Sequence, residues 1–65
     1  MDVGSRIRLY RSSRRLSQRE LAGRLKMAPS QLSRYESGHT EPGLRVLERI
    51  ARTLGVPVSE FFVGR

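Results

Sequence analysis

The side chains best suited to binding chemistry are thirteen basic residues, and they are distributed unevenly along the chain. Residues 1–34 carry nine basic and two acidic residues, whereas residues 35–65 carry four of each, so the net charge of +7 arises entirely in the first half. Such an asymmetry indicates a polyanionic partner, with nucleic acid first and an anionic membrane second. The alternative is that the charge only keeps a small protein in solution.

Residues typical of catalysis or metal binding are sparse. The chain has no cysteine, which excludes disulfides and thiolate metal sites. His39 is the only histidine, and no second ligand accompanies it in the polar segment where it stands. Five serines could suggest a hydrolase, but the chain lacks a nucleophile-elbow sequence and is too short for a substrate cleft; they are Ser12, Ser13, Ser30, Ser33 and Ser59. We therefore expect a protein that is not an enzyme and has no catalytic residue, metal site or cofactor.

The length of 65 residues allows one domain. A chain this short buries only ~60% of the surface that its unfolded form exposes, so short helices with local contacts are the simplest solution. No apolar run approaches the ~20 residues of a membrane span, and no signal peptide is recognisable. We expect no membrane partner and a cytoplasmic location. Nothing after Phe62 resembles a linker, and we expect the chain to be complete.

Apolar residues recur with helical rather than alternating spacing, which predicts an all-α fold with five helices and no strand. The expected helices cover about residues 4–14, 18–25, 29–36, 43–54 and 57–62, in a single domain spanning 1–65. The residues expected to face inward are Ile7, Leu9, Tyr10, Leu21, Ala22, Leu25, Leu32, Tyr35, Leu44, Leu47, Ile50, Ala51 and Leu54.

The second and third predicted helices are joined by only three residues, 26–28. Ser17 and Glu20 have the spacing of a capping box at the start of the second helix, and Pro29 suits the first position of the third. So short a connection forces two helices to cross steeply, at ~90–120°, and pushes the second of the pair outward. Ala22 supplies the small side chain that a close crossing needs. The pattern predicts a helix-turn-helix.

Three stretches, IRLYRSSRRLSQRELA, LSRYESGHTEP and LERIARTLGVPVSEFF, together resemble the lambda-repressor-like family of helix-turn-helix proteins (Cro-type, xenobiotic-response-element-type). The resemblance covers about residues 4–62. Members are mostly bacterial and phage transcriptional regulators that bind operator DNA as two-fold dimers. The resemblance thus implies a bacterial or phage-encoded, nucleoid-associated protein whose partner is double-stranded DNA.

The resemblance also assigns roles to individual positions. Residues 29–36 look like the recognition helix, whose first turns enter the major groove. Arg34 would pair with guanine and Gln31 with adenine, each such pair discriminating by ~1–3 kcal/mol. The positions expected to read bases are Pro29, Ser30, Gln31, Ser33 and Arg34. Those expected to contact phosphates are Ser17, Gln18, Ser37, His39 and Arg45.

Further roles follow from the same resemblance. Arg11 and Glu36 are expected to form a structural ion pair between the first and third helices. Apart from the resemblance, Tyr10 and Tyr35 are assigned to the core because both fall on inward-facing helical stripes. The chain ends with more apolar surface than a terminus needs, so Phe61 is assigned to the core and Phe62 and Val63 to a dimer interface.

Two positions depart from the family pattern. Lys26 stands where the turn commonly has glycine, and a left-handed backbone there costs ~1 kcal/mol. Ala28 stands where the third helix commonly has a serine or threonine cap, and it offers no side-chain acceptor. Pro29 also prevents the family's contact between Gln18 and the first recognition residue.

The sequence therefore predicts a regulator, most simply a repressor, that binds double-stranded DNA sequence-specifically as a homodimer. Its operator would be an inverted repeat with half-sites about 34–36 Å apart. One alternative is an antitoxin-type module that binds a partner toxin and regulates its own promoter. A third interpretation is a coactivator-type domain that binds RNA.

Overall fold

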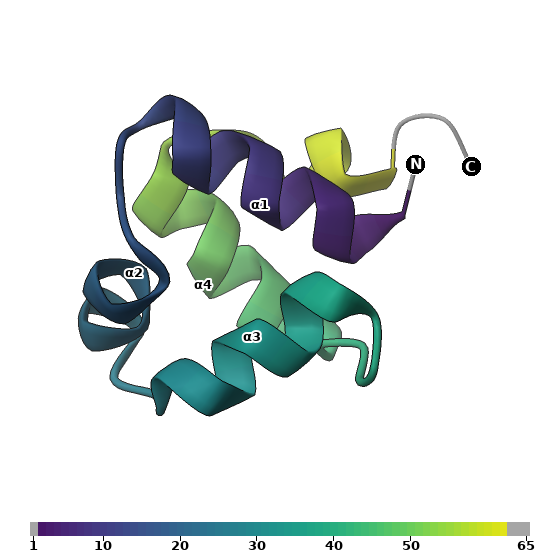
Figure 1. The fold of residues 1–65 in the computed structure, drawn as a ribbon. Coiled ribbons are helices and arrows are strands. Elements are labelled where there is room, and N and C mark those ends of the chain that lie inside the picture. Colours follow the sequence, from purple (N-terminus) through teal and green to yellow (C-terminus); the bar gives the residue numbers. More distant parts are fainter. Residues whose placement is uncertain (1, 63–65) are drawn as a thin grey trace.

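Four α-helices and one short 3-10 helix make up the computed structural model, which describes residues 2–62 (Figure 1). The elements are α1 (Val3–Ser13), α2 (Gln18–Leu25), α3 (Pro29–Ser37), α4 (Leu44–Leu54) and the 3-10 helix η1 (Val58–Phe62). Residues 2–62 contain no strand. The predicted all-α class is confirmed.

The last predicted helix is a 3-10 helix and not an α-helix. Gly55 ends α4 in the left-handed conformation, with φ of 75°, and Pro57 fixes the backbone directly before η1. Only five residues remain for η1. A segment this short closes i→i+3 hydrogen bonds more readily than a full α-helical turn.

One cluster of buried side chains from all five elements forms the core. Its members are Val3, Ile7, Leu21, Ala22, Leu25, Leu32, Tyr35, Leu47, Ile50, Ala51, Leu54 and Phe61. Two inward assignments are wrong, because Leu9 is 49% exposed and Leu44 is 61% exposed. Leu9 lies on the side of α1 opposite Ile7, and Leu44 is the first residue of α4, before the helix reaches the core.

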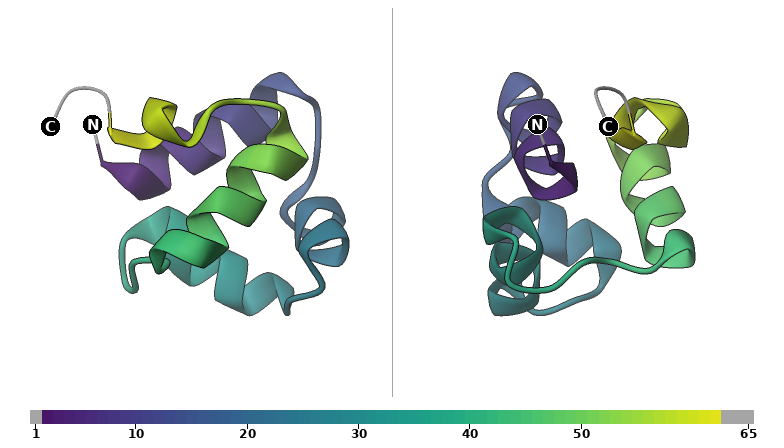
Figure 2. Two further views of the ribbon diagram at one scale, coloured as in Figure 1. Left: turned by 180° about the vertical axis from the view of Figure 1, so that it is seen from behind. Right: turned by 90° about the vertical axis from the view of Figure 1, so that its right-hand side faces the viewer.

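η1 packs back against α1 and closes the core (Figure 2). The Phe61 ring is buried and meets the Tyr10 ring edge-on, with centroids 5.8 Å apart and an interplanar angle of 81°. The Tyr10 hydroxyl donates to Glu60 Oε1 at 2.6 Å. Phe62 is 43% exposed, and Val63 lies outside the described residues. The core assignment of Phe61 is confirmed. The assignment of Phe62 and Val63 to a dimer interface stays a prediction.

The start of α1 lies unusually close to the end of α3. A Cβ atom at Gly4 would stand 2.4 Å from the Tyr35 carbonyl oxygen and 2.7 Å from that of Glu36. Both obstacles are backbone atoms, so no side-chain rotation could relieve them. Gly4 therefore permits an approach of two backbones that any other residue would prevent.

Among the described residues, no helix has the length and apolar character needed to cross a membrane.

Candidate nucleic-acid interface

The turn between α2 and α3 sets the steep crossing of the two helices. In Figure 1, α2 is seen nearly along its axis, whereas α3 runs across the view. Lys26 ends α2 with φ of 58° and ψ of 45°, which is the left-handed conformation expected for this position. The Met27 amide then donates to the Ala22 carbonyl at 3.0 Å. Ala22 itself is fully buried, so its small side chain permits the crossing.

α3 carries the residues expected to read bases, and its exposed side faces away from the core. Pro29, Ser30, Ser33 and Arg34 are exposed, whereas Gln31 is partly buried. The helix begins after Ala28, which is extended and makes no side-chain cap. Its other end is fixed by Gly38 in the left-handed conformation. The first turn of α3 therefore begins without a side-chain cap.

The start of α2 is fully capped. Ser17 Oγ accepts from the Glu20 amide at 3.0 Å, and the Ser17 amide donates to Glu20 Oε1 at 2.8 Å. These two bonds are the predicted capping box. Two groups of Ser17 hold the pKa of the Glu20 carboxyl below its ordinary value. The backbone amide has the larger effect and the side-chain hydroxyl the smaller.

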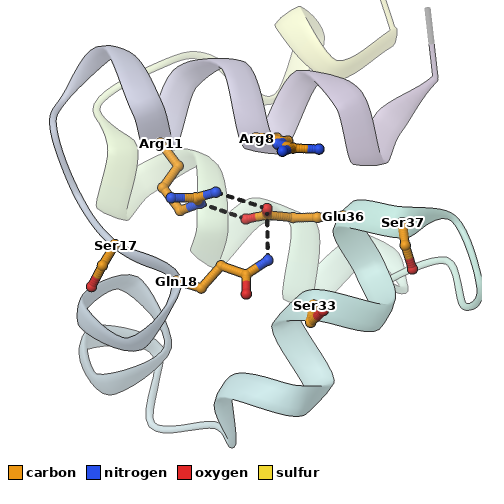
Figure 3. Close-up of a pocket in the computed structure, with 7 residues that line it drawn as sticks. All are labelled: Arg8, Arg11, Ser17, Gln18, Ser33, Glu36 and Ser37. Carbon is orange, nitrogen blue, oxygen red and sulfur yellow. Dashed lines mark hydrogen bonds and ion pairs between the residues drawn. The ribbon is translucent and has the colours of Figure 1, made fainter.

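A polar network joins α1, α2 and α3 beneath the exposed surface (Figure 3). Arg11 Nε donates to Glu36 Oε2 at 2.7 Å, and the Arg11 Nη2 group donates to Glu36 Oε1 at 3.1 Å. Gln18 Nε2 also donates to Glu36 Oε1, at 3.0 Å. The Arg11 Nη1 group donates to the Leu16 carbonyl at 2.7 Å. The side chains of Arg11 and Glu36 are only 13% and 3% exposed, so this ion pair belongs to the interior.

This network changes the expected part of Gln18. The resemblance places Gln18 at a phosphate, but its amide is turned inward to the Glu36 carboxylate. Gln18 thus holds α2 to α3 through Glu36, and its contact with a phosphate stays a prediction.

An open groove of about 460 Å³ lies over the network, between α1, the start of α2 and the later turns of α3. All the residues that line it are polar or charged: Arg8, Arg11, Ser17, Gln18, Ser33, Glu36 and Ser37. Three of the expected phosphate contacts thus line one groove; they are Ser17, Gln18 and Ser37.

The other two expected phosphate contacts lie outside the lining of the groove. His39 is next to it, because its Nδ1 atom is 2.9 Å from the Ser37 hydroxyl. Arg45 is exposed in the first turn of α4 and does not line the groove.

Two groove residues were assigned otherwise by the sequence. Ser33 was grouped with the base-reading residues, and Arg8 was given no role. Arg8 lies three residues before Arg11 on α1, so helical spacing places both on neighbouring parts of one face. That spacing could have indicated Arg8.

Several arginines are used by the fold itself. The Arg14 Nε atom donates to the Leu54 carbonyl at 2.5 Å, and Arg49 donates to the Leu25 carbonyl. Both carbonyls end a helix, where carbonyl groups lack partners within the helix and favour a cation. Fewer guanidinium hydrogens are therefore available to a partner than the number of arginines indicates.

The comparisons with known proteins agree with this geometry. A family model described as helix-turn-helix matches residues 7–61. The chain belongs to the helix-turn-helix family.

Within residues 2–62, no group of three or more acidic, histidine or cysteine side chains is placed to hold a metal ion.

Three curated relatives illustrate the range of this family. An uncharacterized HTH-type transcriptional regulator of Sinorhizobium medicae is 43% identical over 60 residues, which are 92% of this chain and 43% of the relative. The immunity repressor protein of Bacillus phage phi105 is 39% identical over 59 residues, 91% of this chain and 41% of the relative. Multiprotein-bridging factor 1 of Debaryomyces hansenii is 34% identical over 64 residues, 98% of this chain and 43% of the relative. The chain spans less than half the length of these relatives.

Among solved structures, the chain is similar to SinR, a master regulator for biofilm formation, crystallised in complex with DNA. The TM-score is 0.86 at 33% identity, and the match covers 92% of this chain and 97% of that one. The helical arrangement described above is thus also found in a protein bound to DNA.

Proposed function

We propose that this protein binds double-stranded DNA sequence-specifically and regulates transcription, as a repressor that occupies a promoter. The observation that carries the proposal is the exposed side of α3, where Ser30 and Arg34 project beside a polar groove and away from the core. Similarity to a phage immunity repressor and to a regulator solved with DNA supports it. Repression by occupancy needs no chemistry, in keeping with the absence of catalytic motifs in the sequence.

In this proposal α3 reads bases, and residues beyond its end contact phosphates. Arg34, exposed and without a side-chain partner among residues 2–62, forks onto guanine in the major groove, as arginine does in the commonest specific contact. Gln31 reaches bases less easily, because it is partly buried. Arg45 and His39 contact phosphates beyond the end of α3, and such contacts fix the register of the protein on the duplex.

The protein acts as a homodimer in this proposal, with Phe62 and Val63 at the interface. Phe62 contributes a large exposed apolar side chain at the end of the fold. A two-fold dimer requires an inverted-repeat operator with half-sites about 34–36 Å apart, which is one turn of DNA.

The deciding experiment is selection of a random duplex library by the purified protein, followed by sequencing. Enrichment of an inverted repeat with the expected spacing supports a dimeric, sequence-specific regulator. If nothing is enriched and binding is weak and strongly salt-dependent, the proposal is wrong for this chain alone. The protein-binding alternative, which the similarity to a multiprotein-bridging factor favours, then takes its place.

Two variants separate base reading from phosphate binding on the selected duplex. Arg34→Ala should weaken binding chiefly to the preferred site, by ~1–3 kcal/mol. Arg45→Ala should weaken binding to every sequence. The slope of log affinity against log salt concentration should become shallower by about one. An equal loss on all sequences for Arg34→Ala would reassign this residue to phosphate.

A further inference from the structure

The groove over the Arg11–Glu36–Gln18 network has the charge and the lining that suit a single phosphate. Its charged side chains are Arg8, Arg11 and Glu36, which together carry one net positive charge. A phosphodiester carries one negative charge. The hydroxyls of three serines and the amide of Gln18 line the remainder of the groove. Which of these groups still have a hydrogen to donate decides where an anion can bind.

Three of the lining side chains already use donors inside the protein. Gln18 gives one amide hydrogen to Glu36, and Arg11 gives three of its five hydrogens to Glu36 and the Leu16 carbonyl. The Ser37 hydroxyl is within hydrogen-bond distance of the Arg34 carbonyl, at 3.2 Å, and of His39 Nδ1, at 2.9 Å. A hydroxyl has one hydrogen, so Ser37 could donate to a phosphate only by giving up an internal bond.

Arg8 and Ser33 are different, because neither side chain makes a hydrogen bond or ion pair with any residue in the part of the chain that the structure describes. Both are exposed. In Figure 3, Arg8 lies above the network on α1 and Ser33 lies below it on α3. Ser17 stands at the opposite end of the groove from Ser37, and its oxygen accepts from the Glu20 amide. The two lining side chains that make no internal hydrogen bond thus lie on two helices, α1 and α3.

We propose that Arg8 and Ser33 together bind one phosphate of the DNA backbone in this groove. The inference rests on the proposed function and deepens it. Ser33 then positions the protein and does not read a base, and Arg8 becomes a DNA contact supplied by α1. Because α1 and α3 are already joined by Arg11 and Glu36, a phosphate held by both helices fixes the angle at which α3 enters the major groove.

The first test compares Arg8→Ala with Arg52→Ala. Both arginines are exposed on helices, but Arg52 does not line the groove. On the selected operator and on unrelated duplexes, Arg8→Ala should lose about tenfold in affinity, as expected for a hydrogen bond to a charged group. Its plot of log affinity against log salt should be shallower by about one. Arg52→Ala should change neither. Melting curves of both variants verify that they fold.

The second test locates the phosphate. Each phosphate of the operator is replaced in turn by an uncharged methylphosphonate. At one position in each half-site the wild type should lose affinity, whereas Arg8→Ala should lose little further there. Ser33→Ala should weaken binding to all sequences equally, and it should cause no further loss on the duplex with the methylphosphonate at that same position. Ser12→Ala, on the exposed side of α1, serves as its control.

The inference is wrong if Arg8→Ala behaves like Arg52→Ala, or if its loss persists at every modified phosphate. It is also wrong for Ser33 if Ser33→Ala changes which sequence is preferred. These outcomes leave the proposed function intact, since the wild type still binds the operator. If the wild type binds no duplex, the proposed function fails and this inference fails with it.

Discussion

The two ends of α3 are held very differently. At its C-terminal end, Tyr35 and Glu36 are buried, Gly4 brings the backbone of α1 against them, and Arg11 and Gln18 bond to the Glu36 carboxylate. At its N-terminal end, the helix follows a left-handed Lys26 and begins without a side-chain cap. The end proposed to enter the major groove is thus the end with the fewest internal contacts.

This difference suggests how a domain of 65 residues can hold a recognition helix firmly and still expose its first turns. Hydrogen bonds from other helices are concentrated at the C-terminal end of the helix. Among the residues proposed to contact DNA, Arg8, Ser33 and Arg34 have side chains with no hydrogen bond to residues 2–62. The comparison predicts large losses of stability from changes at the C-terminal end and gains from changes at the turn.

The largest effect is expected for Glu36→Ala. The substitution leaves the partly buried Arg11 guanidinium without its carboxylate and should lower the free energy of unfolding by ~3 kcal/mol. Chemical denaturation of the single variants and of Arg11→Ala/Glu36→Ala measures the coupling. A coupling near zero would show that the network does not anchor α3. If Glu36→Ala does not fold, Glu36→Gln, which keeps the acceptor oxygen, provides a milder measurement.

Gly4→Ala tests the backbone contact at the same end. The new Cβ atom would lie 2.4 Å from the Tyr35 carbonyl oxygen, so α1 must move away from α3. The expected loss is ~2 kcal/mol, in the range of overpacked sites. Gly23→Ala is the matched control, because a Cβ atom there meets nothing within 4 Å; it should stabilise α2. Equal effects of the two variants would contradict the close approach.

These residues also show which features a sequence can and cannot reveal. Ser17 and Glu20 act locally, within a few residues, so their spacing was sufficient to predict the capping box, whereas the left-handed turn at Lys26 was implied by the resemblance to the family. Helical periodicity identified most of the core but not the exposure of Leu44, which depends on where α4 begins relative to its neighbours. Gly4 could not be recognised, because its role depends on a backbone more than thirty residues away in sequence.

The candidate site was predictable to a similar extent. The family pattern indicated Arg11 and Glu36 as partners. It did not indicate that Gln18 would turn toward the same carboxylate, because that follows from the crossing of α2 and α3. The position of Ser33 in the groove depends on how far α3 is rotated about its axis, and sequence spacing alone does not fix that angle.

Lys26→Gly examines the other end of α3. Glycine adopts φ of 58° without the steric cost that a Cβ atom brings, so the variant should be more stable by ~1 kcal/mol. Arg24→Gly, two residues earlier and within α2, should be less stable by about the same amount. If thermal and chemical denaturation show that Lys26→Gly gains stability and Arg24→Gly loses it, the turn is strained. Loss of stability in both variants would place the strain elsewhere.

The smallest expected effect is a pH dependence of stability that arises from Glu20 at the capped start of α2. The start of α3 has no side-chain cap and so no such titrating group. The bonds from Ser17 hold the pKa of Glu20 below its ordinary value in the folded protein. A carboxyl with a lowered folded pKa contributes stability above its unfolded pKa, and this contribution is lost as pH falls through the folded value. Glu20→Gln keeps the oxygen acceptor that a capping box needs but cannot titrate.

Melting temperatures of the wild type and of Glu20→Gln, measured from neutral pH down to pH ~3, should therefore converge. The wild type should lose more stability than the variant over the range in which Glu20 takes up its proton. Because the carboxyl is exposed, the difference should be small and should shrink at high salt. A constant difference at every pH would mean that the Glu20 carboxyl stabilises α2 through its shape alone. The ionised capping box at α2 would then have no electrostatic advantage over the uncapped start of α3.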